Sequence, residues 1–320
     1  MAGEDRLNDF INAAKDYCKP MPKNEYEYLN VVNTTGLPDK LLLIHIFPSQ
    51  EQIVQTRKDE TWLRIGDRTK EIKGNDYRNL EYSKNTRRFE DECTLEATIH
   101  DLDQELLAQY KHILNADHLP IEQVLQARGL LKTVGGQTKL TNAAVLLFAE
   151  NIMQFYPNCR VRFVRYEGNT AKTGTQINIV KDKSMDACIL KLVDLAKGYI
   201  VTQLREFTAL DTQTGTFKIV PEYPEFAWLE GIVNAIVHRE YALAGDYILV
   251  AMYDDRLEIK SPGKLPNIVT VENIKHTRYA RNPKISRVLT EFGYVRELNE
   301  GVKRIYSDME AFFLDDPEYS

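Results

Sequence analysis

Hydrophobic and polar positions in the first 90 residues follow first a helical and then a strand-like spacing. Leu7, Phe10, Ile11 and Ala14 lie on one face of a helix predicted over residues 5–18. Apolar and alternating runs predict strands at 26–33, 41–47 and 61–65. The pattern therefore predicts a small α/β unit over residues 1–90.

Residues 105–149 return to helical spacing. Apolar positions predict helices on both sides of Pro120, and the Gly135-Gly136 pair marks a turn. Thr141 is the expected N-cap of the helix that follows. One interpretation is the helix, turn, wing and helix of a winged-helix DNA-binding unit; the other, which we favour, is a packing connector. The predicted helical connector spans residues 91–150.

The rest of the chain, residues 151–320, mixes strands and helices, so the predicted fold class is α+β. Strict alternation in RVRFVRY predicts a half-buried strand at 160–166. Further elements are predicted as a helix at 184–205, a strand at 217–220, a helix at 226–240, and a β-hairpin with strands at 247–253 and 256–260.

One polar stripe on the predicted 226–240 helix is the strongest candidate for chemistry. Glu230, Asn234 and His238 follow one another at intervals of four residues, which places them on one helix face. The stripe is bordered by small residues, namely Ala227, Gly231 and Ala235. We interpret the small residues as room for a molecule to lie against the helix; an ordinary solvent-facing stripe is the alternative.

The hairpin ends in the turn Ser261-Pro262-Gly263, where a glycine lets the backbone come close to a ligand. A loop of about 20 residues follows, and loops of this length are often lids. It carries the bases Lys275, Arg278 and Arg281. The sequence therefore predicts a basic lid near the polar stripe, and a final helix that begins near Gly301.

These segments resemble a known family. YPEFAWLEGIVNAIVHREY, DDRLEIKSPGKLP, RNP and NEGVKRI are similar to stretches of the RecG-related transcriptional regulators, whose C-terminal domain resembles the ATP-binding fold of gyrase, histidine kinases and MutL. The family's usual N-terminal partner is a Schlafen/AlbA-like domain, and LLLIHIFPS and WLRIGDRT resemble its last part. The early part of that domain is not visible here. The resemblance therefore implies a truncated Schlafen/AlbA-like unit followed by a gyrase-type α/β sandwich.

The resemblance also implies roles for matching residues. Glu230 would orient or activate a water, and Asn234 would bind the Mg²⁺ that bridges the phosphates of ATP. Ser261 and Gly263 match the adenine-binding turn, with Ser261 in place of an aspartate. Gly301 matches the phosphate-binding glycines of the lid.

Other matching positions are less defined. His238 and Arg239 belong to the family's HR[DE]Y signature, in which Arg239 either reaches a phosphate or has a structural role. Arg281 is the lid base that we expect at the nucleotide. Leu265 replaces the second glycine of the adenine turn, and Asn299 and Glu300 precede the glycine of the final helix.

Composition and charge narrow the function classes. The net charge of −6 argues against a protein whose whole surface grips nucleic acid, although residues 57–88 carry ten bases and six acids. The GxxxxGK[ST] pattern is absent, which disfavours a motor helicase or a P-loop kinase. No CxxC pair supports a zinc ribbon. No apolar run approaches the roughly 20 residues of a membrane span, and a cytoplasmic location is expected.

Three hypotheses are open. The first, which we favour, is a DNA-linked transcriptional regulator that binds ATP and Mg²⁺ and hydrolyses ATP slowly, if at all. The second is a DNA-binding regulator whose ATPase-like fold no longer binds nucleotide and which contacts phosphates through residues 57–88 and 275–304. The third is a dimerisation scaffold, in which the chain forms a homodimer. None of the three involves a membrane.

Overall fold

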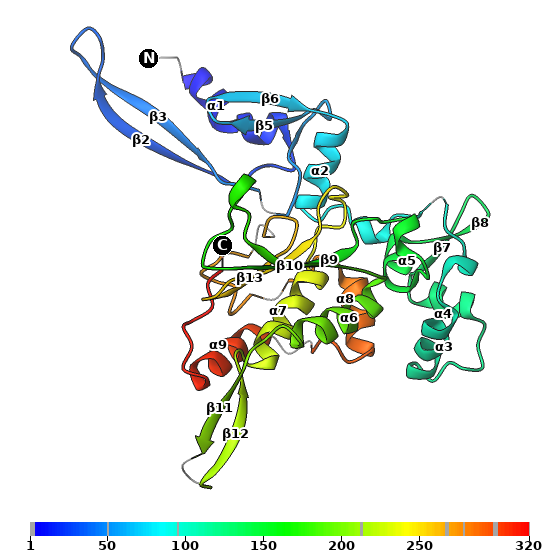
Figure 1. Ribbon diagram of the computed structural model, residues 1–320. Helices are drawn as coiled ribbons and strands as arrows, with labels where there is room; N and C mark the ends of the chain where they lie inside the picture. Colours follow the sequence, from blue (N-terminus) through cyan, green and yellow to red (C-terminus); the bar gives the residue numbers. More distant parts are fainter. Residues whose placement is uncertain are drawn as a thin grey trace. The chain divides into compact units, whose positions relative to one another are not determined.

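The computed structural model of the chain describes residues 4–49, 51–94, 96–211, 214–265, 269–277, 279–296 and 300–319. The chain divides into two compact units, Met1–Arg87 and Arg88–Ser320. Across the described residues helices and small sheets are mixed (Figure 1), so the predicted α+β class is confirmed.

The first unit consists of short antiparallel pairs and two helices. Its predicted helix and three strands are confirmed to within a few residues. The elements are α1 (Glu4–Tyr17), β1 (Cys18–Lys19), β2 (Asn24–Val32), β3 (Pro38–Ile46), β4 (Gln55–Thr56), β5 (Thr61–Ile65), β6 (Arg68–Ile72) and α2 (Asn75–Ser83). β2 pairs with β3, β5 with β6, and β1 with β4.

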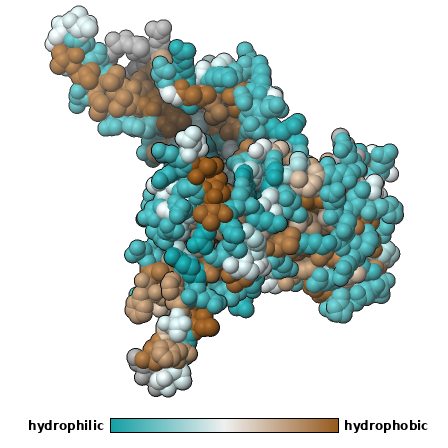
Figure 2. All heavy atoms as spheres, viewed as in Figure 1, coloured by the Kyte–Doolittle hydropathy of each residue, from teal (hydrophilic) through white to brown (hydrophobic). Residues whose placement is uncertain are grey.

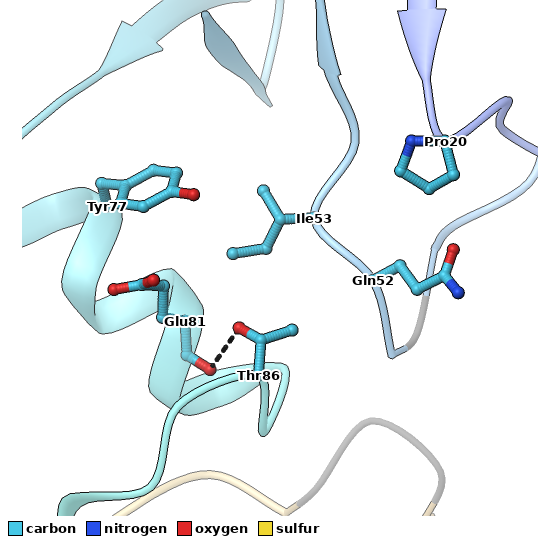
Figure 3. Close-up of a pocket in the computed structure, with 6 residues that line it drawn as sticks. All are labelled: Pro20, Gln52, Ile53, Tyr77, Glu81 and Thr86. Atoms are coloured by element: carbon cyan, nitrogen blue, oxygen red, sulfur yellow. Dashed lines mark hydrogen bonds between the residues drawn. The ribbon is translucent and has the colours of Figure 1, made fainter. Parts of the chain in front are cut away.

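This unit buries little apolar surface. Ile72 is the one hydrophobic side chain that is fully buried among its described residues. The β2–β3 hairpin instead exposes apolar side chains (Figure 2), Val32 at 70% and Ile46 at 66% among them. Figure 3 shows a shallow hollow lined by Pro20, Gln52, Ile53, Tyr77, Glu81 and Thr86. None of the residues predicted to bind nucleotide lies there.

The second unit is built on a four-stranded sheet in the order β10-β9-β13-β14. The strands are β9 (Arg160–Tyr166), β10 (Ile179–Asp186), β13 (Ile248–Met252) and β14 (Leu257–Lys260). β9 and β13 run parallel, and the two outer strands pair antiparallel to their neighbours. Four helices accompany the sheet: α6 (Ile189–Val201), α7 (Glu225–Val237), α8 (Pro283–Glu291) and α9 (Gly301–Ala311).

A two-stranded ribbon, β11 (Glu206–Asp211) with β12 (Thr216–Pro221), joins α6 to α7. It exposes Phe217 at 73% and Ile219 at 69%. Single 3₁₀ turns lie at η1 (Phe89–Asp91), η2 (Ile99–Asp101), η3 (Ile152–Gln154) and η4 (Gly174–Gln176). Within the described residues, no helix combines the length and the apolar character that crossing a membrane requires.

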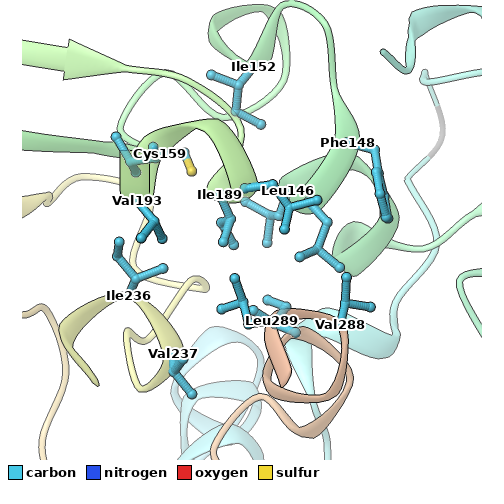
Figure 4. Packing of buried hydrophobic residues seen from close by; sticks show 14 of the residues in the cluster. Leu146, Phe148, Ile152, Cys159, Ile189, Val193, Ile236, Val237, Val288 and Leu289 are labelled. Atoms are coloured by element: carbon cyan, nitrogen blue, oxygen red, sulfur yellow. The ribbon is translucent and has the colours of Figure 1, made fainter. Parts of the chain in front are cut away.

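The predicted connector contributes to the same core as the rest of the second unit. Its elements are α3 (Gln104–Ile113), α4 (Ile121–Ala127), β7 (Leu131–Val134), β8 (Gln137–Leu140) and α5 (Asn142–Phe148). All seven residues of α5 are buried. Leu146 packs in one cluster with Ile189, Ile236 and Leu289 (Figure 4). The division of the chain into domains at residues 90 and 150 stays a prediction.

The contacts of the connector support the packing interpretation over the winged-helix one. Val124 and Leu125 of α4 are buried. The ammonium of Lys132, on the β7–β8 hairpin, donates to the carbonyl of Asp91 at 2.5 Å. Thr141 is the N-cap of α5, because its hydroxyl accepts a hydrogen bond from the N–H of Ala144 at 3.4 Å. That prediction is confirmed.

One prediction is wrong in part. The helix predicted over 184–205 begins only at Ile189, because residues 179–186 form strand β10. Ser184 and Asp186 pair with Arg162 and Arg160 of β9 in antiparallel register. Backbone pairing with a neighbouring strand outweighs the helical periodicity of the sequence at this point.

Candidate functional site

Helix α7 places two polar side chains one above the other. Its inward side carries buried residues such as Ile232 and Ile236. Glu230 and Asn234 are half-buried on another side, and the Asn234 amide donates to Oε1 of Glu230 at 3.2 Å. The i, i+4 spacing in the sequence is thus realised as a direct hydrogen bond within one helix.

The glycine that begins α9 lies directly against this pair. A β-carbon built on Gly301 would collide with Oε1 of Glu230, so only a glycine permits the observed approach. The backbone N–H groups in the first turn of a helix lack intrahelical partners and carry the positive end of the helix dipole. An acid, a carboxamide and a helix N-terminus therefore meet at one place, although 71 residues separate Glu230 from Gly301.

The surroundings of Glu230 make it a stronger base than an exposed glutamate. Burial raises the pKa of its carboxyl group, while the hydrogen bond from Asn234 and the charge of Arg304 act in the opposite direction. The Arg304 guanidinium also lies 3.9 Å from the centroid of the Phe226 ring. A carboxylate with a raised pKa suits proton transfer from a water near neutral pH.

The small residues beside the polar stripe serve packing rather than a ligand. A β-carbon built on Gly231 would lie 2.8 Å from Cδ1 of Ile259 in β14. Ala227 and Ala235 are buried. The room that the sequence predicts beside the helix is therefore taken by the protein's own sheet and core.

The turn after β14 is fixed to the end of α7. The Ser261 hydroxyl donates to the carbonyl of Ala235 at 2.7 Å. Gly263 has a φ of +114°, and a β-carbon there would collide with the side chains of Arg281 and Glu240. The bond from Ser261 to Ala235 uses the hydroxyl proton and leaves the oxygen lone pairs able to accept a hydrogen bond from adenine, but the group carries no negative charge.

His238 and Arg239 lie where α7 ends. His238 is the C-cap residue, and burial together with the charge of Arg281 lowers its pKa to about 4. Arg239 is 3% exposed, and its guanidinium donates to the carbonyls of Leu243 and Asp246. These contacts give Arg239 a structural role in the loop before β13; a phosphate contact stays a prediction.

Arg281 and its neighbour hold the lid segment against α7. Arg281 forms an ion pair with Glu240 at 3.4 Å and donates to the carbonyl of Lys264. Asn282, which sequence reasoning noted only as part of RNP, is 4% exposed and donates to the carbonyls of Val237 and Arg239 at 2.8 and 2.9 Å. Helix α8, which was not predicted from the sequence, begins at Pro283, and a proline at the first helical position is the signal that would have found it.

The predicted site residues therefore fall into two groups. Glu230, Asn234 and Gly301 come together at the α7–α9 contact. The others, His238, Arg239, Ser261, Gly263 and Arg281, hold the C-terminal end of α7 and the turn beside it. Two predicted positions, Arg278 and Asn299, lie outside the described residues.

Metal binding at this place rests on few protein ligands. In the described part of the chain, no group of three or more His, Cys, Asp or Glu residues could hold a metal ion. The Asn234 amide oxygen is a hard ligand of the kind that Mg²⁺ accepts, and Mg²⁺ in nucleotide sites is held by one or two protein groups plus phosphates. The residues present fit a magnesium ion that arrives with a nucleotide.

Comparison with known proteins supports the C-terminal part of this description. Residues 245–320 match the family model described as "Putative ATP-dependent DNA helicase recG C-terminal". The matched range includes Gly263, Arg281 and Gly301 but begins after Glu230 and Asn234. The chain thus contains an ATPase-like region related to the recG C-terminus. The Schlafen/AlbA-like assignment of its first residues stays a prediction.

A solved structure has a similar fold. The crystal structure of the DIP2311 protein from Corynebacterium diphtheriae matches with a TM-score of 0.57 and 21% sequence identity. The match covers 98% of this chain and 59% of that chain, so the present chain spans less than two thirds of the length of its structural relative. A search of curated proteins finds no match.

Proposed function

We propose that the chain is a DNA-linked regulator whose second unit binds Mg·ATP between α7 and α9. The observation that carries this proposal is the hydrogen-bonded Glu230–Asn234 pair set against Gly301 at the N-terminus of α9. The match of residues 245–320 to a recG C-terminal ATPase-like model supports it independently.

Each group in the pair has a definite chemical task. The Asn234 amide already donates to Glu230, which leaves its oxygen as the group to ligate Mg²⁺. The bound Mg²⁺ would neutralise charge on the phosphates. Glu230, with its raised pKa, would accept a proton from an attacking water. The N-terminus of α9 would face phosphate oxygens.

Slow turnover and weak adenine recognition follow from the same geometry. The turn that would receive adenine offers the neutral hydroxyl of Ser261 in place of a carboxylate, so it accepts a hydrogen bond from adenine more weakly. Glu230 is half-buried and its Oε1 lies against Gly301, which restricts the approach of a water to that oxygen. We therefore expect ATP to act as a switch ligand, and motor helicase activity is not part of the proposal.

Nucleotide binding is tested by thermal unfolding with a non-hydrolysable ATP analogue and Mg²⁺. At a ligand concentration about a hundredfold above Kd, binding adds about 2.7 kcal/mol to stability. We expect this gain in the wild type and its loss in Asn234→Ala. Glu225→Gln, an exposed position on the same helix, is the matched control and should keep the gain. No shift at any nucleotide concentration would refute nucleotide binding.

DNA binding is the second component, and the exposed bases of the first unit support it. Arg57, Arg64, Arg68 and Arg78 are exposed, and Trp62 is 46% exposed within the same stretch. Phosphate contacts release counterions, so affinity for duplex DNA should fall steeply with salt. The double variant Arg64→Ser/Arg68→Ser should bind DNA more weakly. Because two phosphate contacts are lost, the slope of log K against log[salt] should become shallower by about 2. A salt-independent affinity would contradict this component.

The alternative is a DNA-binding regulator or dimerisation scaffold that binds no nucleotide. It is favoured by the neutral Ser261 in the turn that would receive adenine and by the packing of Gly301 on Glu230. The thermal experiment separates the two, because only the first function predicts a ligand-dependent gain that Asn234→Ala removes. A homodimer belongs to this alternative, and solution molecular mass tests it.

A further inference from the structure

The chain after α9 folds back onto that helix, and the C-terminus lies near β10 and β13 in the view of Figure 1. Residues 314–319, here called the return segment, follow the last turn of α9, where the N–H of Leu314 donates to the carbonyl of Met309 at 3.0 Å. The hydroxyl of Tyr306, on α9, donates to the carbonyl of Pro317 at 3.1 Å. The return segment is thus attached to the helix that carries Gly301.

Two aromatic rings fix the end of the return segment. Tyr319 stacks on Tyr306 with ring centroids 6.4 Å apart and an interplanar angle of 22°. The ammonium of Lys275, from the lid loop, lies 3.3 Å from the centroid of the Tyr306 ring. The lid loop, α9 and the return segment therefore all meet at Tyr306.

Tyr319 lies close to the catalytic candidate. Its side chain is half-buried, and burial, Tyr306 and the charge of Glu230 together raise its pKa to about 12. Glu230 in turn lies against Gly301. The return segment is thus docked on the helix whose first residue lies against the carboxylate that the proposed function assigns to water activation.

The charge of the return segment opposes the expected ligand. Asp315, Asp316 and Glu318 are all exposed, and they lie within four residues of Tyr319. Three negative charges beside a site for a triphosphate repel that ligand through the solvent. The charge of the segment therefore disfavours nucleotide binding.

We propose that residues 314–319 are an autoinhibitory segment, which must leave Tyr306 before a nucleotide reaches Glu230 and Asn234. This inference rests on the proposed function. Because a bound segment leaves only part of the population competent, the apparent Kd for nucleotide equals the intrinsic Kd divided by the competent fraction. Nucleotide and return segment then compete, and each weakens the binding of the other.

The test is direct titration of the 320-residue chain with Mg²⁺ and a fluorescent ATP analogue. Tyr319→Ala removes the ring stack and should lower the apparent Kd by about three- to tenfold. Tyr319→Phe keeps the stack and should match the wild type. Phe313→Ala, at a side chain that is 97% exposed, is the control for removing an aromatic ring nearby and should also match it.

The outcomes separate this inference from the proposed function. Equal Kd values for wild type and Tyr319→Ala would overturn autoinhibition and leave nucleotide binding intact. Binding by neither protein would overturn both. Hydrogen exchange gives a second readout: saturation of the wild type with Mg·ATP should increase amide exchange in residues 314–319. Unchanged exchange in that segment, despite bound nucleotide, would also contradict displacement.

Discussion

The carboxylate of Glu90 accepts hydrogen bonds from the backbone N–H of Lys284 at 3.0 and 3.1 Å, although 194 residues separate the two. It also accepts from the N–H of Ile285 at 3.1 Å. Glu90 is 1% exposed, so a buried carboxylate accepts hydrogen bonds from the backbone N–H groups in the first turn of α8. This contact joins the start of the second unit to the helix that follows the lid.

Glu90 should make stability depend on pH. Burial raises its pKa from 4.5 to about 7, while the two N–H donors oppose the shift. The folded state therefore holds the proton more tightly than the unfolded state. Its stabilising contribution is full below pH 4.5 and is lost as pH rises through about 7, by up to about 3 kcal/mol. Urea unfolding of wild type and Glu90→Gln across this range measures the difference.

The Glu90→Gln variant cannot titrate at this position, so the unfolding free energy of the wild type should fall relative to that of the variant as pH rises from 4.5 to 7. Glu105→Gln, at an exposed acid in the first turn of α3, should behave like the wild type. If the wild type instead gains stability relative to Glu90→Gln as pH rises, the helix N-terminus outweighs burial and the assignment of the pKa shift is wrong.

His238 should make stability depend on pH in the direction opposite to Glu90. Burial and the charge of Arg281 lower its pKa from 6.5 to about 4, so the folded state favours the neutral ring. Stability from this group is full above pH 6.5 and is lost as pH falls through about 4, by up to about 3 kcal/mol. Glu90 and His238 therefore partly cancel in the wild type. His238→Gln should retain more stability at acid pH than wild type does, relative to neutral pH, in the same urea measurement.

Asn282→Ala should destabilise the second unit by about 2–3 kcal/mol. The substitution leaves the carbonyls of Val237 and Arg239 without their buried donor. Asn151→Ala, at an exposed position of the same unit, should change stability by no more than about 0.5 kcal/mol. Chemical denaturation of both variants decides this, and equal effects would show that the two hydrogen bonds contribute little.

Gly301→Ala should disturb the candidate site because the new methyl group displaces the Glu230 carboxylate. We expect a loss of about 1 kcal/mol in unfolding free energy and a smaller gain from Mg·ATP. Gly198→Ala is the matched control, since its β-carbon meets nothing within 4 Å in α6. The unfolding free energy of that control should rise by about 0.5–1 kcal/mol. If the unfolding free energy of Gly301→Ala rises by as much, the close approach of Gly301 to Glu230 is not required.

Local patterns were sufficient for many elements. Alternation predicted strand 160–166 at the bounds that the structure gives, and the threonine signal located the N-cap of α5 at Thr141. The i, i+4 spacing placed Glu230 and Asn234 on one helix face. Each of these features depends on neighbours within a few residues, which a sequence displays directly.

Contacts between distant segments were not predictable in this way. The sequence alone showed a Glu–Asn pair on one helix, a glycine before another helix, and a basic loop between them. Only the tertiary structure placed Gly301 on Glu230, Asn282 under the end of α7, and Tyr319 on the Tyr306 ring of α9. Side-chain spacing along one helix is set by local geometry, whereas these three contacts depend on how sheet, core and helices pack, and no local pattern encodes that packing.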